Sequence, residues 1–140
     1  MASYVKFHDT IRAICEGEHN FATSGGDTLK IYLTNATPSA SDDADKADLA
    51  EIAAGNGYTS GGQDTTNTGS ESAGTYTVAM TDVIWTASGG AIAQFRYVVC
   101  YNDDHASDGL ICHWDYGSAV DVADGETFTT DFGANTFTIA

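Results

Sequence analysis

The side chains of this chain that could do chemistry are 4 histidines, 3 cysteines and 20 acidic residues. The spacing of His8, His19, His105 and His113 fits no metal-binding motif. The chain also lacks the short motifs of serine hydrolases, zinc proteases, phosphate-binding loops and dinucleotide-binding folds. His113 stands mid-strand beside Trp114, where a packed histidine is expected rather than a ligand. We therefore predict no catalytic residue and expect that the protein is not an enzyme.

Acidic residues gather at three places where carboxylates could bind a cation. Residues 103–108 offer oxygen ligands of the kind Ca²⁺ prefers, but they lack the glutamate and the spacing of an EF-hand loop. Residues 42–45 open an expected helix, where acidic side chains complement the helix dipole. Residues 121–126 flank a turn, and paired carboxylates for glycoside hydrolysis require a geometry that the sequence does not show. We predict neither a metal site nor a cofactor.

The cysteines are Cys15, Cys100 and Cys112, an odd number without the spacing of paired ligands. This pattern argues against a disulfide scaffold and against a zinc site. Cys100 and Cys112 are expected to be neighbours across two strands. In a reducing cell they should remain thiols and pack as small core residues.

The charge of the chain is strongly one-sided, with 5 Lys and Arg against 20 Asp and Glu and a net charge of −15. Such a surface repels nucleic-acid backbones and anionic membranes, so neither is expected as a partner. No segment is long and apolar enough to span a bilayer, and the first residues do not have the pattern of a secretory signal. We expect synthesis in a cytoplasm and a well-solvated surface; cation binding or docking on a basic partner is the alternative use of the acidity.

Residues 95–117 predict a hairpin that holds 5 of the 15 aromatic side chains. Two runs rich in β-branched and aromatic residues flank a polar loop at 102–109. If the strands pair symmetrically about Ala106, the opposed residues are Cys100 and Cys112, Val98 and Trp114, and Arg96 and Tyr116. The second face then carries Phe95, Tyr97, Val99, Tyr101, Ile111 and His113. Because both faces are largely apolar, each needs a cover: the protein core on one side and a helix or a neighbouring subunit on the other.

The remaining elements are short. Residues 4–15 predict an amphipathic helix with Ser3 as its N-cap, and residues 41–54 predict a second helix. Strands are expected at 28–34, at 75–86 with a break near 81–82, at 127–132 and at 136–139. The polar segment 58–74 reads as a long surface loop, with room for a weak edge strand.

These elements together predict an all-β fold in a single domain over residues 1–140. We expect a β-sandwich, of which a jelly roll is one form, with two short peripheral helices; a closed barrel is the alternative. Residues 1–17 would form an N-terminal helical arm, and residues 58–74 a long polar loop.

Several runs of strand and turn residues invite comparison with a known family. They are DTLKIYLTN at 27–35, FRYVV at 95–99, YND at 101–103, WDYGS at 114–118, and the ending from DGETFT at 124–129 to IA at 139–140. These runs resemble small acidic structural proteins of tailed bacteriophages that are encoded among virion morphogenesis genes. The resemblance covers nearly the whole chain, but it includes no site motif, so no functional residue carries over from it.

The resemblance implies a virion structural protein, most specifically a head decoration or cement protein on the outer capsid surface. Its partners would be the major capsid protein and copies of itself, as a dimer or trimer, because binding at symmetry positions adds avidity. A tail or adaptor component is the alternative within this class. The candidate interface residues are Tyr4, Phe7, Ile11, Tyr97, Tyr101 and His113.

A carbohydrate- or receptor-binding β-sandwich module is the alternative from a different class. Such a module would use aromatic side chains as a stacking platform. A platform needs several exposed aromatic rings on one concave face, whereas a capsid-binding protein can bury them. The exposure of the aromatic residues therefore discriminates between the two hypotheses.

Overall fold

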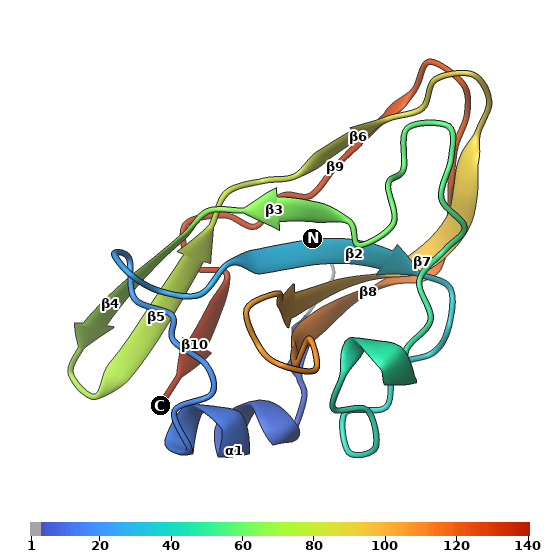
Figure 1. Ribbon diagram of the computed structural model, residues 1–140. Helices are drawn as coiled ribbons and strands as arrows, with labels where there is room; N and C mark the ends of the chain where they lie inside the picture. The colour runs from blue at the N-terminus through green and yellow to red at the C-terminus, as the bar shows by residue number, and fades with distance from the viewer. Residues whose placement is uncertain (1–3) are drawn as a thin grey trace.

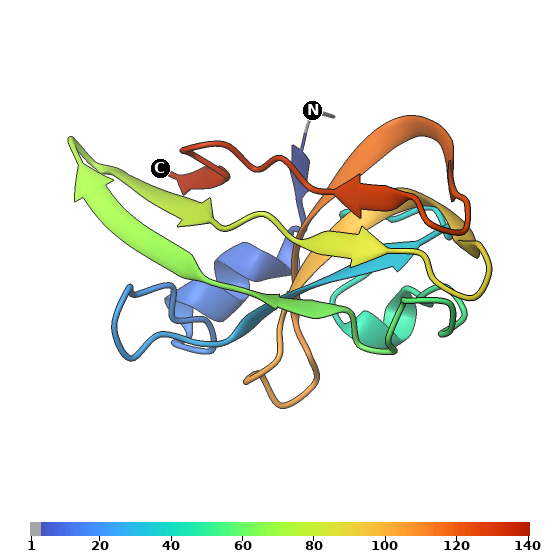
Figure 2. The same cartoon turned by 90° about the horizontal axis from the view of Figure 1, so that it is seen from above.

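A computed structural model describes residues 4–140 and shows an all-β, sandwich-like fold (Figures 1 and 2). The larger layer is a five-stranded antiparallel sheet in the order β1-β8-β7-β2-β3. Its strands are β1 (Tyr4–Lys6), β2 (Leu29–Thr34), β3 (Gln63–Thr65), β7 (Ile92–Asn102) and β8 (Leu110–Val122). The predicted fold class is confirmed.

The second layer consists of two small antiparallel sheets, in the orders β10-β5-β4 and β6-β9. Its strands are β4 (Asn67–Ser72), β5 (Thr75–Met80), β6 (Ile84–Thr86), β9 (Thr127–Thr129) and β10 (Phe137–Ile139). In Figure 2, β5 runs on into β6 along the chain, so the two small sheets continue one another. The strands expected at 28–34, in 75–86 and near the end of the chain are all present.

The main hydrophobic core lies on one face of the five-stranded sheet, against the second layer. Leu29, Ile31 and Leu33 of β2 are fully buried in it, because alternate residues of a strand point to the same face. Trp85 of β6 and Phe95 of β7 are fully buried in the same core. The core therefore joins the two layers of the sandwich.

A smaller hydrophobic core covers the other face of the same sheet. Its members are Phe7, Tyr32, Leu49, Val99, Tyr101 and Leu110. They lie beneath α1 (Asp9–Cys15) and the 3₁₀ turn η1 (Lys46–Asp48). The chain therefore supplies its own cover for this face of the β7–β8 hairpin at Val99, Tyr101 and Leu110. Of the two expected covers, this is the one from within the chain.

The predicted hairpin register is confirmed at its centre, where Cys100 lies opposite Cys112 and Val98 opposite Trp114. It is wrong farther along, because the register shifts between Phe95 and Tyr97 and Phe95 pairs with Val120. Phe95 consequently joins the main core rather than the smaller one. Ile111 also joins the main core, beside a second register shift between Cys100 and Tyr101.

The predicted N-terminal helix is only partly correct. Residues Tyr4–Lys6 form a strand that pairs with β8, and the helix itself is confined to Asp9–Cys15. The hydroxyl of Thr10 holds the helix on β8 through the carbonyl oxygens of Leu110 and Ile111, at 3.0 and 2.9 Å. Residues 4–17 are thus part of the sandwich and not a free arm; the predicted cap, Ser3, lies outside the described residues.

The predicted helix at 41–54 is wrong, since only the three-residue turn η1 forms there. Leu49 enters the smaller core, whereas Ile52 enters the main core. The backbone N–H of Ile52 donates to the carbonyl oxygen of Leu33 at 3.0 Å, so the chain runs beside the end of β2. A helix would have placed both side chains on one face.

The long polar loop expected at 58–74 is also corrected, because it contains β3 and β4. β3 pairs with β2 and β4 pairs with β5, so this segment passes from one layer to the other. Its polar composition reflects strands at the edges of their sheets, where one face or one edge meets solvent.

Candidate functional site

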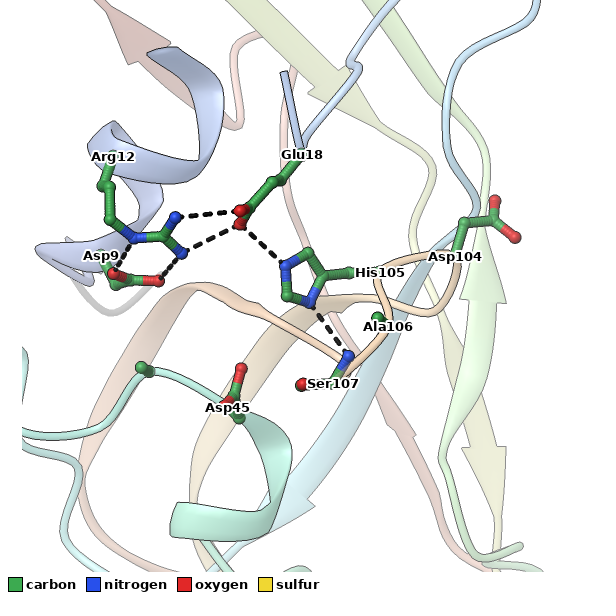
Figure 3. A pocket seen from close by; sticks show the side chains of 9 residues that line it. Asp9, Arg12, Glu18, Asp45, Asp104, His105, Ala106 and Ser107 are labelled. Carbon is green, nitrogen blue, oxygen red and sulfur yellow. Dashed lines mark hydrogen bonds and ion pairs between the residues drawn. The ribbon is translucent and has the colours of Figure 1, made fainter. Parts of the chain in front are cut away.

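A polar pocket of about 620 Å³ lies between α1, the turn before η1 and the β7–β8 loop (Figure 3). Its lining residues are Asp9, Arg12, Glu18, Ala44, Asp45, Asp104, His105, Ala106 and Ser107. It contains both basic and acidic groups, so it is the first place to look for a functional site.

Arg12 organises the acidic side of the pocket. Its Nε lies 2.7 Å from Asp9 Oδ1 and its Nη2 lies 2.9 Å from Glu18 Oε2, and it also pairs with Glu16. The hydrogen bonds from Arg12, and then that from His105, lower the pKa of Glu18 to about 2. Because these side chains are largely exposed, the ion pairs contribute little to stability, but they keep the carboxylates charged.

His105 is held by hydrogen bonds at both ring nitrogens. Its Nε2 lies 3.0 Å from Glu18 Oε2, and its Nδ1 accepts the backbone N–H groups of Ser107 and Gly109 at 3.2 Å each. An Nδ1 that accepts carries a lone pair, so the ring proton resides on Nε2 and is donated to Glu18. Both nitrogens are therefore used to fix the β7–β8 loop to the segment after α1.

Behind His105, a second set of polar contacts ties the same loop down. Asn102 Nδ2 lies 3.0 Å from His19 Nδ1 and 2.6 Å from Asp27 Oδ2. Burial, and then the nearby His105, lower the pKa of His19. This network joins the end of β7 to two residues that lie 83 and 75 positions earlier in the chain.

The acidic residues of the β7–β8 loop do not converge on a common point. Asp103 pairs with Lys30 at 3.3 Å, and Asp104 Oδ2 accepts the backbone N–H of Thr28 at 2.6 Å. Among residues 4–140, no group of three or more His, Cys, Asp or Glu side chains is arranged to hold a metal ion. The polar side chains of the pocket thus bind one another, and these contacts hold the β7–β8 loop in place.

Glu51 forms a second polar centre that the sequence did not reveal. Its Oε1 lies 2.7 Å from Ser60 Oγ and 3.2 Å from Lys46 Nζ. Its Oε2 lies 2.9 Å from Tyr58 Oη and 2.8 Å from the backbone N of Gly61. Burial raises the pKa of Glu51, but these hydrogen bonds outweigh it and the net pKa is lowered. The contacts fasten residues 46–61 over the sheet.

Most of the predicted interface residues are inside the protein. Phe7, Tyr97, Tyr101 and His113 are buried, which corrects the expectation that they face a partner. Tyr4 is half-buried, and Ile11 is exposed. An apolar second face on the hairpin suggested an interface. The smaller core packs on that face instead.

No aromatic side chain among residues 4–140 is exposed. Both tryptophans are buried, and the least buried rings, those of Tyr4, Tyr76, Tyr116 and Phe128, are half-buried and pack against the main core. A sugar-stacking platform needs exposed rings, so its structural requirement is missing from the described part of the chain.

Comparisons with protein-family models, with curated proteins and with solved structures found no match. Within residues 4–140, none of the helical segments has the length and apolar character required to cross a membrane.

His113 should make the stability of the protein sensitive to acid. Neither ring nitrogen has a hydrogen-bond partner among the described residues, and the ring packs edge-on against Phe7 at 5.2 Å. Burial lowers the pKa of His113, against the opposing effect of Asp115 and Asp43. Below a pH of about 6.5 the unfolded chain therefore takes up a proton that the folded chain resists, and stability falls as the pH drops.

We expect His113→Phe, which retains a packed ring, to lose about 1 kcal/mol less stability than the wild type between pH 7.5 and pH 5. Urea unfolding at the two pH values measures this difference. His8→Gln, at an exposed histidine, is the control and should behave like the wild type. Equal losses in His113→Phe and the wild type would contradict the prediction.

Proposed function

We propose that this protein is a non-catalytic structural component of a tailed-phage virion that binds the outer surface of the capsid. The family resemblance supplies the virion assignment. The observation that carries the structural role is that the aromatic side chains of residues 4–140 are buried or half-buried and that the polar side chains of the pocket bind one another, while the chain as a whole is strongly acidic.

The basic residues support the same proposal. Lys30 pairs with Asp64 and Asp103, Lys46 with Glu51, and Arg96 with Asp115. Arg12 is likewise surrounded by carboxylates. The positive charge of these four of the five basic residues is thus neutralised locally, which disfavours contact with packaged DNA and suits an exterior position.

Two alternatives remain distinct from this proposal. A tail or adaptor component has the same structural requirements, and the number of copies in the particle separates it from a capsid protein. A carbohydrate-binding module is disfavoured by the burial of the aromatic rings.

Quantitative mass spectrometry of purified particles tests the proposal. We expect the protein in many copies, at a fixed ratio to the major capsid protein that matches a capsid symmetry. Particles that lack the protein should release DNA at a lower temperature than complete particles. Adding the purified protein should restore the release temperature. A few copies per particle would indicate a tail component, and absence from the particle would refute a virion role.

A further inference from the structure

Cys100 and Cys112 lie next to each other inside the main core. They are directly opposite residues of β7 and β8, and both side chains are fully buried. Residues opposite each other on antiparallel strands have Cα atoms about 4.5 to 5.5 Å apart. A disulfide spans Cα separations of about 4.4 to 6.8 Å. The paired strands therefore hold the two cysteines at a separation that a disulfide can bridge.

The contacts of the two thiols support this pairing. Burial, and then a hydrogen bond with the Cys100 side chain, raise the pKa of Cys112. The Sγ of Cys100 also lies 3.9 Å from the Sδ of Met80 on β5. The third cysteine, Cys15, is exposed at the end of α1. The fold thus places Cys100 and Cys112 opposite each other and leaves Cys15 at the surface.

We propose that Cys100 and Cys112 are a site of oxidative modification, at which hydrogen peroxide forms a disulfide that fastens the β7–β8 hairpin. Peroxide oxidises one thiol to a sulfenic acid and is itself reduced to water. The second thiol then attacks the sulfenic sulfur, and the S–S bond forms. The sulfenic hydroxyl leaves with the proton of the second thiol as another water. Two thiols and one peroxide thus give one disulfide and two waters.

Burial of the pair sets the conditions under which this disulfide forms. The thiolate is the reactive form of cysteine, and a raised pKa makes it scarce, so the folded protein should react slowly. In a reducing compartment the glutathione pool keeps thiols reduced. The disulfide therefore belongs to the protein in an oxidising medium. This inference does not rest on the proposed function, whose failure would leave it intact.

The disulfide would close a short loop that carries part of the polar pocket. Residues 101–111 lie between the two cysteines and include His105, which binds Glu18. A crosslink restricts the unfolded chain and thereby stabilises the folded one. For a loop of this length we expect the oxidised protein to have a Tm roughly 5 °C or more above that of the reduced protein.

The full chain with Cys15→Ser tests the proposal, because this variant retains only the buried pair. After treatment with hydrogen peroxide in native buffer, it should lose about 2 Da and show the higher Tm. Proteolytic cleavage at Asp103, Asp104 or Asp108 separates the two cysteines, so a linked pair of peptides identifies the bond. Dithiothreitol should restore the original mass and Tm. Adding Cys112→Ala gives the matched control, which should gain no Tm on oxidation.

Three results would overturn the proposal. The mass could rise by about 16 Da per oxygen without a crosslink, which would place the oxidation on Met80 or on a single thiol. The crosslink could form only in urea, which would show that the folded hairpin excludes it. The crosslink could also lower Tm, which would show that the native strand pairing does not fit a disulfide. All three are measured on the Cys15→Ser protein, so none depends on the folding of the Cys112→Ala control.

Discussion

Replacing Glu51 with alanine is expected to lower the free energy of unfolding by about 3 kcal/mol. The carboxylate accepts hydrogen bonds from Tyr58, Ser60 and the backbone of Gly61, and it pairs with Lys46. The Glu51 side chain is only 16% exposed, so these donors would lose their partner in a largely dehydrated place. Lys46, which lies 5.2 Å from the centre of the Tyr32 ring, would then be a poorly compensated charge.

Thermal or urea unfolding of Glu51→Ala measures this loss, which corresponds to a decrease in Tm of roughly 10 °C. Glu16→Ala is the matched control, because Glu16 is 55% exposed and Arg12 keeps Asp9 and Glu18 as partners. It should change stability by about 0.5 kcal/mol or less. Glu51→Gln should fall between the two, since an amide retains one acceptor oxygen. Equal stability of Glu51→Ala and Glu16→Ala would show that the four contacts do not act as a structural centre.

The strands were predictable where the sequence alternates with period two over a long enough run. Leu29, Ile31 and Leu33 share one core, and Tyr32 enters the other, as the alternation requires. The centre of the β7–β8 hairpin was predictable because its loop is short and polar. The register shift near Arg96 was not, since nothing in the local sequence distinguishes a bulge from a regular pair.

The helices were harder to predict because apolar spacing of three and four residues has more than one solution. Leu49 and Ile52 have helical spacing, but they enter different cores on opposite faces of the sheet. The polar centres were not predictable either. Glu18 and His105 are 87 residues apart, so only the folded chain brings them together.

Gly62→Ala is expected to be among the most damaging single substitutions in the chain, with a loss of about 3 kcal/mol or more. Gly62 has φ of +76°, and an added Cβ would overlap the carbonyl oxygen of Ile31. That carbonyl belongs to β2, beside the first residue of β3, which pairs with Ile31. The backbone must therefore move where the chain enters β3, at the edge of the five-stranded sheet.

Gly125→Ala separates the two causes of the stability loss in Gly62→Ala, which are the backbone conformation and the overlap with Ile31. Gly125 has φ of +84°, but an added Cβ would meet nothing within 4 Å. Its substitution should cost about 1 kcal/mol, from backbone conformation alone. Urea unfolding of both variants measures the difference, which is the part due to the contact with β2. If both variants lose the same stability, the close approach of Gly62 to Ile31 does not constrain the fold, and the β2–β3 junction tolerates rearrangement.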